Sequence, residues 1–314
     1  MKDHQDPTRP SERDPATDGS ERQRERLERH VIRLASQIGP RNSYHHGALQ
    51  DALGFIEASL AEVGHVPVRQ PYEARGQSFA NIAAEMPGAD RRDEIVVVGA
   101  HYDTHQDSPG ADDNGSAVAA LLELARNFAH RPTSRTLRFV AFTNEEAPFT
   151  RRRDMGSRVY ARACRERGED ITAMICLESL GCYADEPGSQ WLSLGGLLLP
   201  RRGDFLALVA NGRSRGLLAR VVTTLGTLHR SLPYRALVLP TNVPGAWSSD
   251  HWSFWREGYP AVMVTDTAPL RNRFYHTRQD TPDKVDFKRL DQAANDLTAV
   301  IADLVGTSEA EPGC

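Results

Sequence analysis

The sequence predicts an α/β fold with a mostly parallel central sheet and helices on both of its faces. Short apolar segments alternate along the chain with longer segments in which apolar residues recur at helical spacing. Several of the short segments are continuously apolar, as expected for strands that are covered on both faces. Strands that alternate with helices in this way are typical of a parallel sheet.

The first part of the chain predicts two helices followed by two strands. Segments 21–36 and 47–64 carry apolar residues at helical spacing. Segments 66–74 and 78–88 then have the character of strands. Pro71 favours an edge position for the first strand, because proline cannot donate a hydrogen bond to a neighbouring strand.

Four later segments predict the core of the sheet, with helices between them. The expected strands are 94–101, 136–146, 171–181 and 259–267, and the expected helices are 114–129, 154–167 and 286–306. Asn114 can cap the first of these helices. The Gly- and Pro-containing stretch 184–204 is expected to be an inserted loop or hairpin.

Composition argues against nucleic-acid and membrane partners. The 314 residues carry a net charge of −4, and the 38 Lys and Arg are scattered among 42 Asp and Glu. A nucleic-acid groove would need a basic stripe, and none is visible. No apolar run approaches the length of a membrane span. The oligomeric state is left open.

The sequence predicts a single catalytic domain at 23–307, between a disordered polar tail at 1–22 and a flexible end at 308–314. The tail lacks the apolar stretch of a secretory signal. The four cysteines form neither a CxxC pair nor a regular framework, which is typical of reduced thiols. We therefore expect a cytoplasmic location.

Acidic and histidine side chains gather at the carboxyl ends of the predicted core strands, where ligands bind in open α/β sheets. In chain order they are His101 and Asp103, Asp112 and Asp113, Glu145 and Glu146, Glu178, and His276. Taken singly, each has an ordinary interpretation as a solvated turn, a helix cap or a surface residue. Together they predict a metal site, because buried charges are paired or bind metal.

The ligand types indicate zinc. Two histidines and several carboxylates, with no thiolate, suit a catalytic zinc site. The carboxylates are too many for one tetrahedral ion. Two ions about 3.5–4 Å apart, sharing one bridging carboxylate, would use them.

Five motifs, in order, carry a resemblance to a known family. They are GAHYD with GADDNGSA, FTNEEAPF with DMGS, LESLG, SDHWSF, and YHTRQDTPDK, within about residues 25–305. They closely resemble the motifs of the di-zinc aminopeptidases of metallopeptidase family 28, which also includes glutamate carboxypeptidases and glutaminyl cyclases. The resemblance implies a zinc-exopeptidase architecture of the phosphorylase/hydrolase-like kind.

The resemblance also implies a set of ligands for two zinc ions. His101 and Glu178 would bind one ion, although many members of the family have Asp where this chain has Glu178. Glu146 and His276 would bind the other ion. Asp112, the first residue of the acidic pair, would bridge both.

Three further residues receive roles from the same resemblance. Asp103 would accept a hydrogen bond from the second ring nitrogen of His101. Glu145 would be the general base that takes a proton from a zinc-bridging water. Tyr275 would donate a hydrogen bond to the oxyanion, or would simply be a packed aromatic. The bond Asp112–Asp113 could take the cis form.

Other polar residues close to the motifs have no settled role. His105 is expected in a solvated loop. Asp250 and His251 match a motif position that shapes the substrate pocket in relatives, and His251 is expected to support the site rather than to bind metal. The run Arg151–Arg153 is expected to be solvated, although it could favour a carboxylate in the substrate.

The predicted function is removal of N-terminal residues from peptide substrates by a co-catalytic di-zinc exopeptidase. One alternative is a single-zinc acyltransferase of the glutaminyl-cyclase type. Another is a related carboxypeptidase or N-acyl amino-acid hydrolase, which would need a cationic pocket. A non-enzymatic binding module is the third, and the complete ligand set with Glu145 argues against it.

Overall fold

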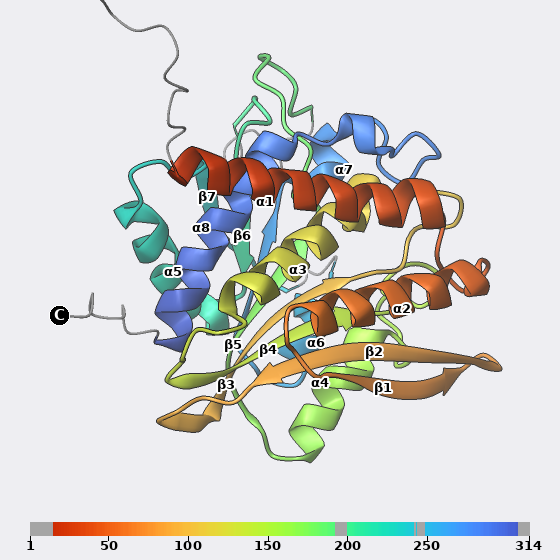
Figure 1. Cartoon of the computed structure of the whole chain (residues 1–314), viewed down its shortest axis with the longest axis vertical. Coiled ribbons are helices and arrows are strands. Elements are labelled where there is room, and N and C mark those ends of the chain that lie inside the picture. Colours follow the sequence, from red (N-terminus) through yellow and green to blue (C-terminus); the bar gives the residue numbers. More distant parts are fainter. Residues whose placement is uncertain (1–14, 192–199, 242, 244–248, 307–314) are drawn as a thin grey trace, which may run out of the picture.

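The structure, a computed structural model, describes residues 15–191, 200–241, 243 and 249–306. One eight-stranded sheet runs through this part of the chain, in the order β1-β2-β4-β3-β5-β8-β6-β7 (Figure 1). Its strands are β1 (Pro67–Ala74), β2 (Gln77–Met86), β3 (Arg91–His101), β4 (Arg135–Phe142), β5 (Asp170–Glu178), β6 (Leu206–Ala210), β7 (Tyr234–Val238) and β8 (Ala261–Thr265).

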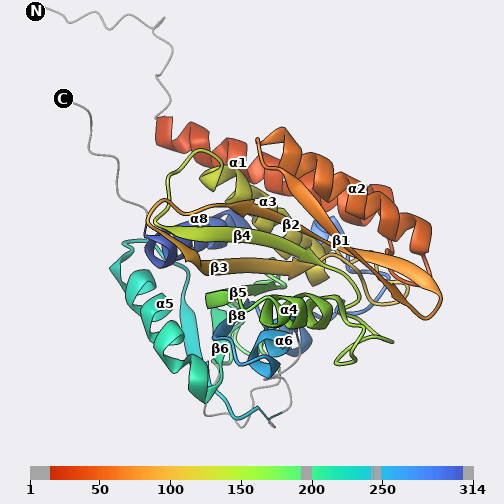
Figure 2. The same cartoon turned by 90° about the horizontal axis from the view of Figure 1, so that it is seen from below.

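Eight α-helices are found among the described residues. They are α1 (Pro15–Ile32), α2 (His46–Glu62), α3 (Ala117–Phe128), α4 (Gly156–Glu166), α5 (Arg215–Thr227), α6 (His251–Arg256), α7 (Ala268–Arg271) and α8 (Phe287–Val305). Figure 2 shows α1, α2, α3 and α8 on one face of the sheet and α4 and α6 on the other. The predicted α/β class is therefore confirmed.

The direction of the strands brings the polar motifs together. The four core strands β4, β3, β5 and β8 are parallel to one another. Their carboxyl ends therefore meet at one edge, where β3 ends at His101 and β5 ends at Glu178. Antiparallel neighbours flank this core, with β2 beside β4 and β6 beside β8.

Strand β3 shows how the sequence produces this layered structure. Side chains alternate between the two faces of a strand. Val96 and Val98 accordingly pack with helix α3 on one face, while Ile95 and Val97 pack with α4 on the other. Full burial of each such side chain stabilises the fold by about 1.5–3 kcal/mol, which explains why residues 95–100 of this strand are apolar.

The structure differs from the sequence-based expectation in the second half of the chain and at its start. The short strands β6 and β7 and the helices α5 and α6 are not predicted by the apolar pattern. Helix α1 begins at Pro15, so the predicted tail is wrong for residues 15–22. The remainder of that tail and the predicted flexible end at 308–314 lie outside the described residues.

Two further expectations concern the surface of the molecule. Pro71 does lie in an edge strand, since β1 is paired with β2 alone. The predicted inserted segment at 184–204 is pinned at its base by a bridge between Ala184 and Gly203, and residues 192–199 within it are not described. Within the described part of the chain, no helix has both the length and the apolar character needed to cross a bilayer.

Candidate metal centre

A tight turn between β3 and α3 carries the acidic pair to the carboxyl edge of the sheet. Residues Ala111–Ser116 form a π-helical turn in which Asp113 has non-helical dihedral angles (φ −101°, ψ 95°). Gly110 begins this turn with a φ of +61°, and a Cβ atom there would lie 2.4 Å from the side chain of Thr104. Glycine is therefore the residue that this close approach allows.

A buried arginine holds the loop in front of the turn. The guanidinium of Arg41 donates hydrogen bonds to the carbonyl oxygens of Tyr102 (2.7 Å), Pro109 (2.7 Å) and Gly110 (3.0 Å). Its side chain is fully buried, and this burial lowers its pKa to about 10. No pattern in the sequence distinguishes Arg41 from the many surface arginines.

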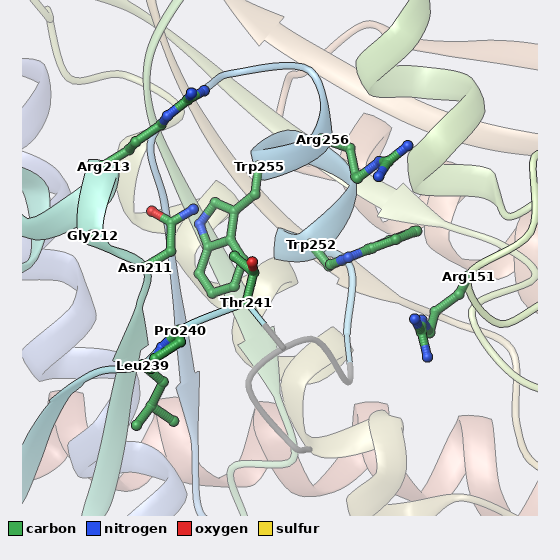
Figure 3. A pocket seen from close by; sticks show the side chains of 10 residues that line it. All are labelled: Arg151, Asn211, Gly212, Arg213, Leu239, Pro240, Thr241, Trp252, Trp255 and Arg256. Atoms are coloured by element: carbon green, nitrogen blue, oxygen red, sulfur yellow. The ribbon is translucent and has the colours of Figure 1, made fainter. Parts of the chain in front are cut away.

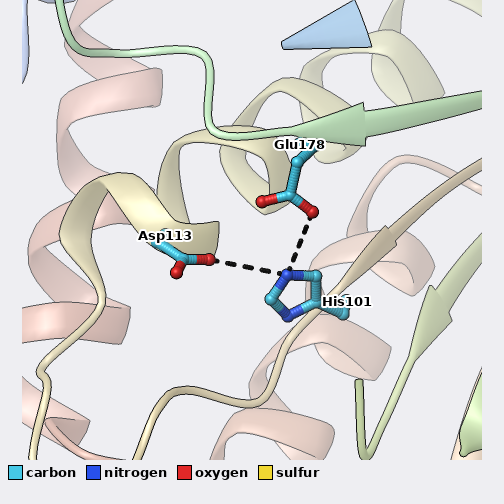
Figure 4. Close-up of side chains that lie close together, drawn as sticks. All are labelled: His101, Asp113 and Glu178. Atoms are coloured by element: carbon cyan, nitrogen blue, oxygen red, sulfur yellow. Dashed lines mark ion pairs between the residues drawn. The ribbon is translucent and has the colours of Figure 1, made fainter. Parts of the chain in front are cut away.

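Two groups of potential metal ligands share a single aspartate, Asp113. In the first group, His101 Nε2 lies 3.5 Å from Asp113 Oδ1 and 3.3 Å from Glu178 Oε2 (Figure 4). In the second group, His276 Nε2 lies 3.0 Å from Asp113 Oδ2 and 3.0 Å from Glu146 Oε1. Each oxygen of the Asp113 carboxylate thus faces one histidine–glutamate pair.

The second group has the unsatisfied polar atoms that a cation would satisfy. Asp113 Oδ2, Glu146 Oε1 and His276 Nε2 are buried, and none has a hydrogen-bond partner among the described residues. Unpartnered polar atoms of this kind are costly to bury. Imidazole nitrogen and carboxylate oxygen are both zinc ligands, so the residues present fit the predicted metal.

The prediction that Asp112 lies between the two groups is wrong. Its Oδ1 accepts hydrogen bonds from Gly181 N (2.9 Å) and Ser116 Oγ (3.2 Å), and its Oδ2 accepts one from Asn272 Nδ2 (3.1 Å). The Asp112 carboxylate is therefore used to hold the loops around the turn, and Asp113 takes the expected central place.

The cis peptide bond is also one residue away from its expected position. It joins Asp113 to Asn114 rather than Asp112 to Asp113. The side chain of Asn114 fixes the turn to the end of β5, because its Nδ2 donates to Leu177 O (3.1 Å) and its Oδ1 accepts from Ser179 N (2.8 Å). The side chain of Asn114 therefore does not cap helix α3 as predicted, but links the turn to the backbone at the end of β5.

Asp280 supports the same turn and was not predicted from the sequence. Its two carboxylate oxygens accept hydrogen bonds from the backbone N–H groups of Asp112 (3.0 Å) and Asp113 (3.1 Å). Burial and the nearby Asp112 raise the pKa of Asp280 to about 8. Its place in the YHTRQDTPDK motif, four residues after His276, is the signal that could have identified it.

Asp103 connects the first group to the second. The ring Nδ1 of His101 lies 3.6 Å from Asp103 Oδ1 and 3.2 Å from its carbonyl oxygen. The Asp103 carboxylate also accepts the backbone N–H groups of Glu145 and Glu146, each at 3.1 Å. Asp103 thus contacts His101 chiefly through its carbonyl oxygen, and its carboxylate fixes the turn that carries the two glutamates.

Glu145 lies beside the ligand groups rather than within them. Its Oε2 is 4.0 Å from His101 Nε2, and its side chain is almost completely buried. Burial, followed by the charges of Glu146 and Glu178, raises the pKa of Glu145 well above its ordinary range. A carboxylate with such a high proton affinity is suited to accept a proton.

Two aromatic rings pack against His276. The ring of Tyr275 stacks on it with centroids 3.8 Å apart, and the ring of His105 stacks on it at 4.1 Å with planes 9° apart. The solvated loop expected for His105 therefore contacts the site. The predicted oxyanion contact of Tyr275 stays a prediction.

The segment that leads into helix α6 closes the site behind Glu178. Ser249 Oγ donates a hydrogen bond to Glu178 Oε2. Asp250 and His251 are fully buried, and burial raises the pKa of Asp250 to about 7. The His251 ring packs edge-on against Trp255, with centroids 4.5 Å apart, and belongs to neither ligand group.

Comparison with known sequences decides the family. The sequence profile of peptidase family M28 matches residues 81–301, which is more than half of the chain. The chain belongs to peptidase family M28. It is therefore a metallopeptidase, and the family predicted from the five motifs is confirmed. The uncharacterized protein YfbL of Escherichia coli (strain K12) is 33% identical over 287 residues, covering 88% of this chain and 87% of YfbL.

Other M28-like proteins are more distant. Aminopeptidase YwaD of Bacillus subtilis (strain 168) is 26% identical, and the match covers 71% of this chain but 44% of YwaD. The zinc aminopeptidase BSAP from Bacillus subtilis superimposes with a TM-score of 0.71 at 16% identity, covering 93% of this chain and 96% of BSAP. A glutaminyl cyclase from Fimbriiglobus ruber superimposes with a TM-score of 0.64 at 21% identity, and the match covers 89% of this chain and 95% of the cyclase. These likenesses of structure establish the shared fold.

Proposed function

We propose that this M28 metallopeptidase is an aminopeptidase that works with two zinc ions. The observation that carries the proposal is the position of Asp113, whose two oxygens each face a separate pair of one histidine and one glutamate. A bridging carboxylate is what two neighbouring ions require. The names of YwaD and BSAP, both aminopeptidases, support the same activity.

Five side chains would hold the metal. His101 and Glu178 form one pair, Glu146 and His276 form the other, and Asp113 is common to both. Bound zinc supplies a water of lowered pKa and polarises the carbonyl of the scissile bond.

The remaining steps belong to residues of the chain. Glu145 accepts a proton on its carboxylate and returns it to the nitrogen of the leaving amine. Asp103 keeps the ring of His101 oriented, because it lies against the Nδ1 side of that ring. Tyr275, whose ring stacks on His276, donates a hydrogen bond from its hydroxyl group to the oxyanion. Peptides with a free amino end are the substrates.

A second candidate is an acyltransferase of the glutaminyl-cyclase type, which the likeness to the Fimbriiglobus ruber enzyme favours. Such an enzyme would work with one zinc ion. The complete pairing of His101 with Glu178 argues against it, because a single-zinc enzyme has no use for that pair. The two candidates therefore differ in the number of ions that the chain binds.

Metal analysis together with a substrate panel tests the proposal. We expect about two zinc ions per chain by mass spectrometry, and release of 4-nitroaniline from several aminoacyl anilides. Glu145→Gln should keep the zinc but lower kcat by about 10³-fold, because it removes the proton acceptor. One zinc ion per chain without anilide turnover would favour the cyclase, and a protein without bound metal would reject both candidates.

A cytoplasmic location is the last part of the proposal. It rests on the absence of a cysteine framework among the four cysteines of the sequence. Cell fractionation of the producing organism, with an antibody to the protein, checks it directly.

A further inference from the structure

A basic cavity lies beside helix α6, separate from the ligand groups. It has a volume of about 770 Å³. Two indole rings and three guanidinium groups contribute to its described lining, and no carboxylate does (Figure 3). The charged and aromatic members are Arg151, Arg213, Arg256, Trp252 and Trp255. A concave surface of this composition favours an anion that also presents apolar surface.

The described lining of the cavity contains no carboxylate that could offset its positive charge. Arg213 and Arg256 make no ion pair with any carboxylate among the described residues. Arg158, just outside the lining, differs because it is paired with Glu257 at 2.9 Å. The cavity is therefore a local basic site on a chain whose net charge is −4.

Trp252 lies at the centre of this arrangement. The guanidinium carbons of Arg151 and Arg256 are each 5.7 Å from the centroid of its ring. Contacts of this kind hold a guanidinium group over the face of an indole ring, and a guanidinium presents several N–H groups that can bind an oxyanion. The Trp252 ring is drawn between Arg151 and Trp255 in Figure 3.

On both of its sides the cavity is lined by residues that are close in the chain to partners of the metal-centre glutamates. On one side, Arg151 follows Thr150, whose hydroxyl donates to Glu145 O (2.8 Å) and whose N–H donates to Glu146 O (3.2 Å). On the other side, Trp252 is three residues after Ser249, the residue that donates to Glu178. The backbone N–H of Trp252 also donates a hydrogen bond to Ser249 O (3.1 Å). A peptide bound at the metal centre can therefore extend into the cavity.

We propose that this cavity is a subsite that binds a carboxylate of the peptide substrate, beyond the bond that is cleaved. The carboxylate is either an acidic side chain or the C-terminal group, and the arginines recognise the same chemistry in both. This proposal rests on the proposed function. It assigns the enzyme a preference for acidic or short peptides.

Matched peptides test the preference and separate the two sources of the carboxylate. One series is Leu-(Gly)n-Glu amide against Leu-(Gly)n-Gln amide, and the other is Leu-(Gly)n as the free acid against the amide. We expect the KM of the acidic member to be about 10-fold lower at one value of n, because a charge-assisted hydrogen bond is lost in the neutral member. If the first series shows the lower KM, the cavity binds an acidic side chain; if the second series shows it, the cavity binds the C-terminal carboxylate.

Variants assign the preference to the cavity. In Arg151→Gln/Arg256→Gln, the ratio of KM between the neutral and the acidic peptide should fall towards one. Arg33→Gln, an exposed arginine next to α1, is the control and should keep the ratio of the parent protein. A parent ratio of one, or a ratio that persists in the double variant, would overturn the proposal.

A binding measurement distinguishes failure of this proposal from failure of the proposed function. The probe is acetyl-Gly-Gly-Gly-Glu amide, which has no free amino end. The same peptide with Gln in place of Glu is the neutral control. The acidic peptide should change the tryptophan fluorescence of the protein at lower concentration than the neutral peptide, and Trp252→Phe should reduce the change. This result would support the subsite even if no peptide were hydrolysed, whereas equal responses to both peptides would reject it.

Discussion

The metal centre and the basic cavity border the same helix, α6, but they are built in opposite ways. At the metal centre the side chains are buried and acidic, and backbone N–H groups hold the carboxylates of Asp103, Asp112 and Asp280. In the cavity the charged side chains are basic, and two of them, Arg151 and Arg256, lie over the ring of Trp252. The first arrangement fixes ligand atoms in place through hydrogen bonds, while the second places long arginine side chains against an aromatic ring.

This difference suggests that the metal centre and the cavity have separate functions, one in binding metal and the other in selecting the substrate. Groups that bind metal must be positioned closely, and supporting hydrogen bonds provide that precision. Groups that select a substrate can tolerate movement, because a guanidinium can bind a carboxylate from several directions. Changes at the metal centre should therefore have larger effects than changes in the cavity.

The largest effect is expected when one of the two neighbouring aspartates, Asp113, is replaced by asparagine, with the same replacement of Asp112 as the comparison. Asp113→Asn should remove most of the bound zinc and abolish activity, because a neutral amide replaces the carboxylate shared by both groups. Asp112→Asn should retain the zinc, since the Asp112 carboxylate accepts hydrogen bonds from Gly181 and Asn272 and belongs to neither ligand group. Zinc per chain, measured by mass spectrometry after dialysis, compares the two variants. Loss of zinc in Asp112→Asn alone would show that the central position is wrongly assigned.

The fold and the composition of the site are predictable from the sequence to different extents. Residues 95–100 of β3 are recognisable as a strand because both faces of this part are buried, so its residues are apolar throughout. Strand β7 is not recognisable, because three of its five residues are exposed at the sheet edge. The family can be predicted from motifs that are local in the sequence. The family prediction is therefore confirmed although strands β6 and β7 were not predicted.

The choice between Asp112 and Asp113 shows what local sequence cannot provide. Two adjacent acids are chemically equivalent in the sequence, and only the course of the turn decides which one faces the histidines. That course depends on distant partners, such as Asp280 and Asn272, which are 168 and 160 residues away from Asp112 along the chain. The role of Arg41 escaped prediction for the same reason, because its partners are backbone carbonyls of a distant loop.

A moderate effect is expected from removing the ring that stacks on His276. His105→Ala should accelerate loss of zinc from the second group about 10-fold, a magnitude typical of residues that support a metal ligand. The reason is that the His276 ring loses a parallel neighbour at 4.1 Å. The rate of zinc transfer to a chelating dye measures the effect. His105→Phe keeps a stacking ring and should behave like the parent protein, whereas equal rates for all three proteins would contradict the idea.

The smallest effect is expected from a buried acid that serves neither the metal centre nor the cavity. Asp296 in α8 accepts the backbone N–H of Leu232 at 2.8 Å, and burial raises its pKa to about 6. The folded state therefore binds the proton more tightly than the unfolded state, whose carboxyl has a pKa of about 3.9. The free energy of unfolding should consequently fall as the pH rises from about 4 to about 6, and then level off.

Replacing this acid tests whether burial of a carboxylate costs stability where no cation is available. Asp296→Asn keeps an oxygen that can accept the Leu232 N–H but removes the charge. The variant should melt a few degrees higher than the parent protein at pH 7, and the difference should disappear near pH 4. Thermal unfolding at the two pH values, on the metal-loaded protein, measures it. A difference that is independent of pH would show that the charge of Asp296 is not responsible.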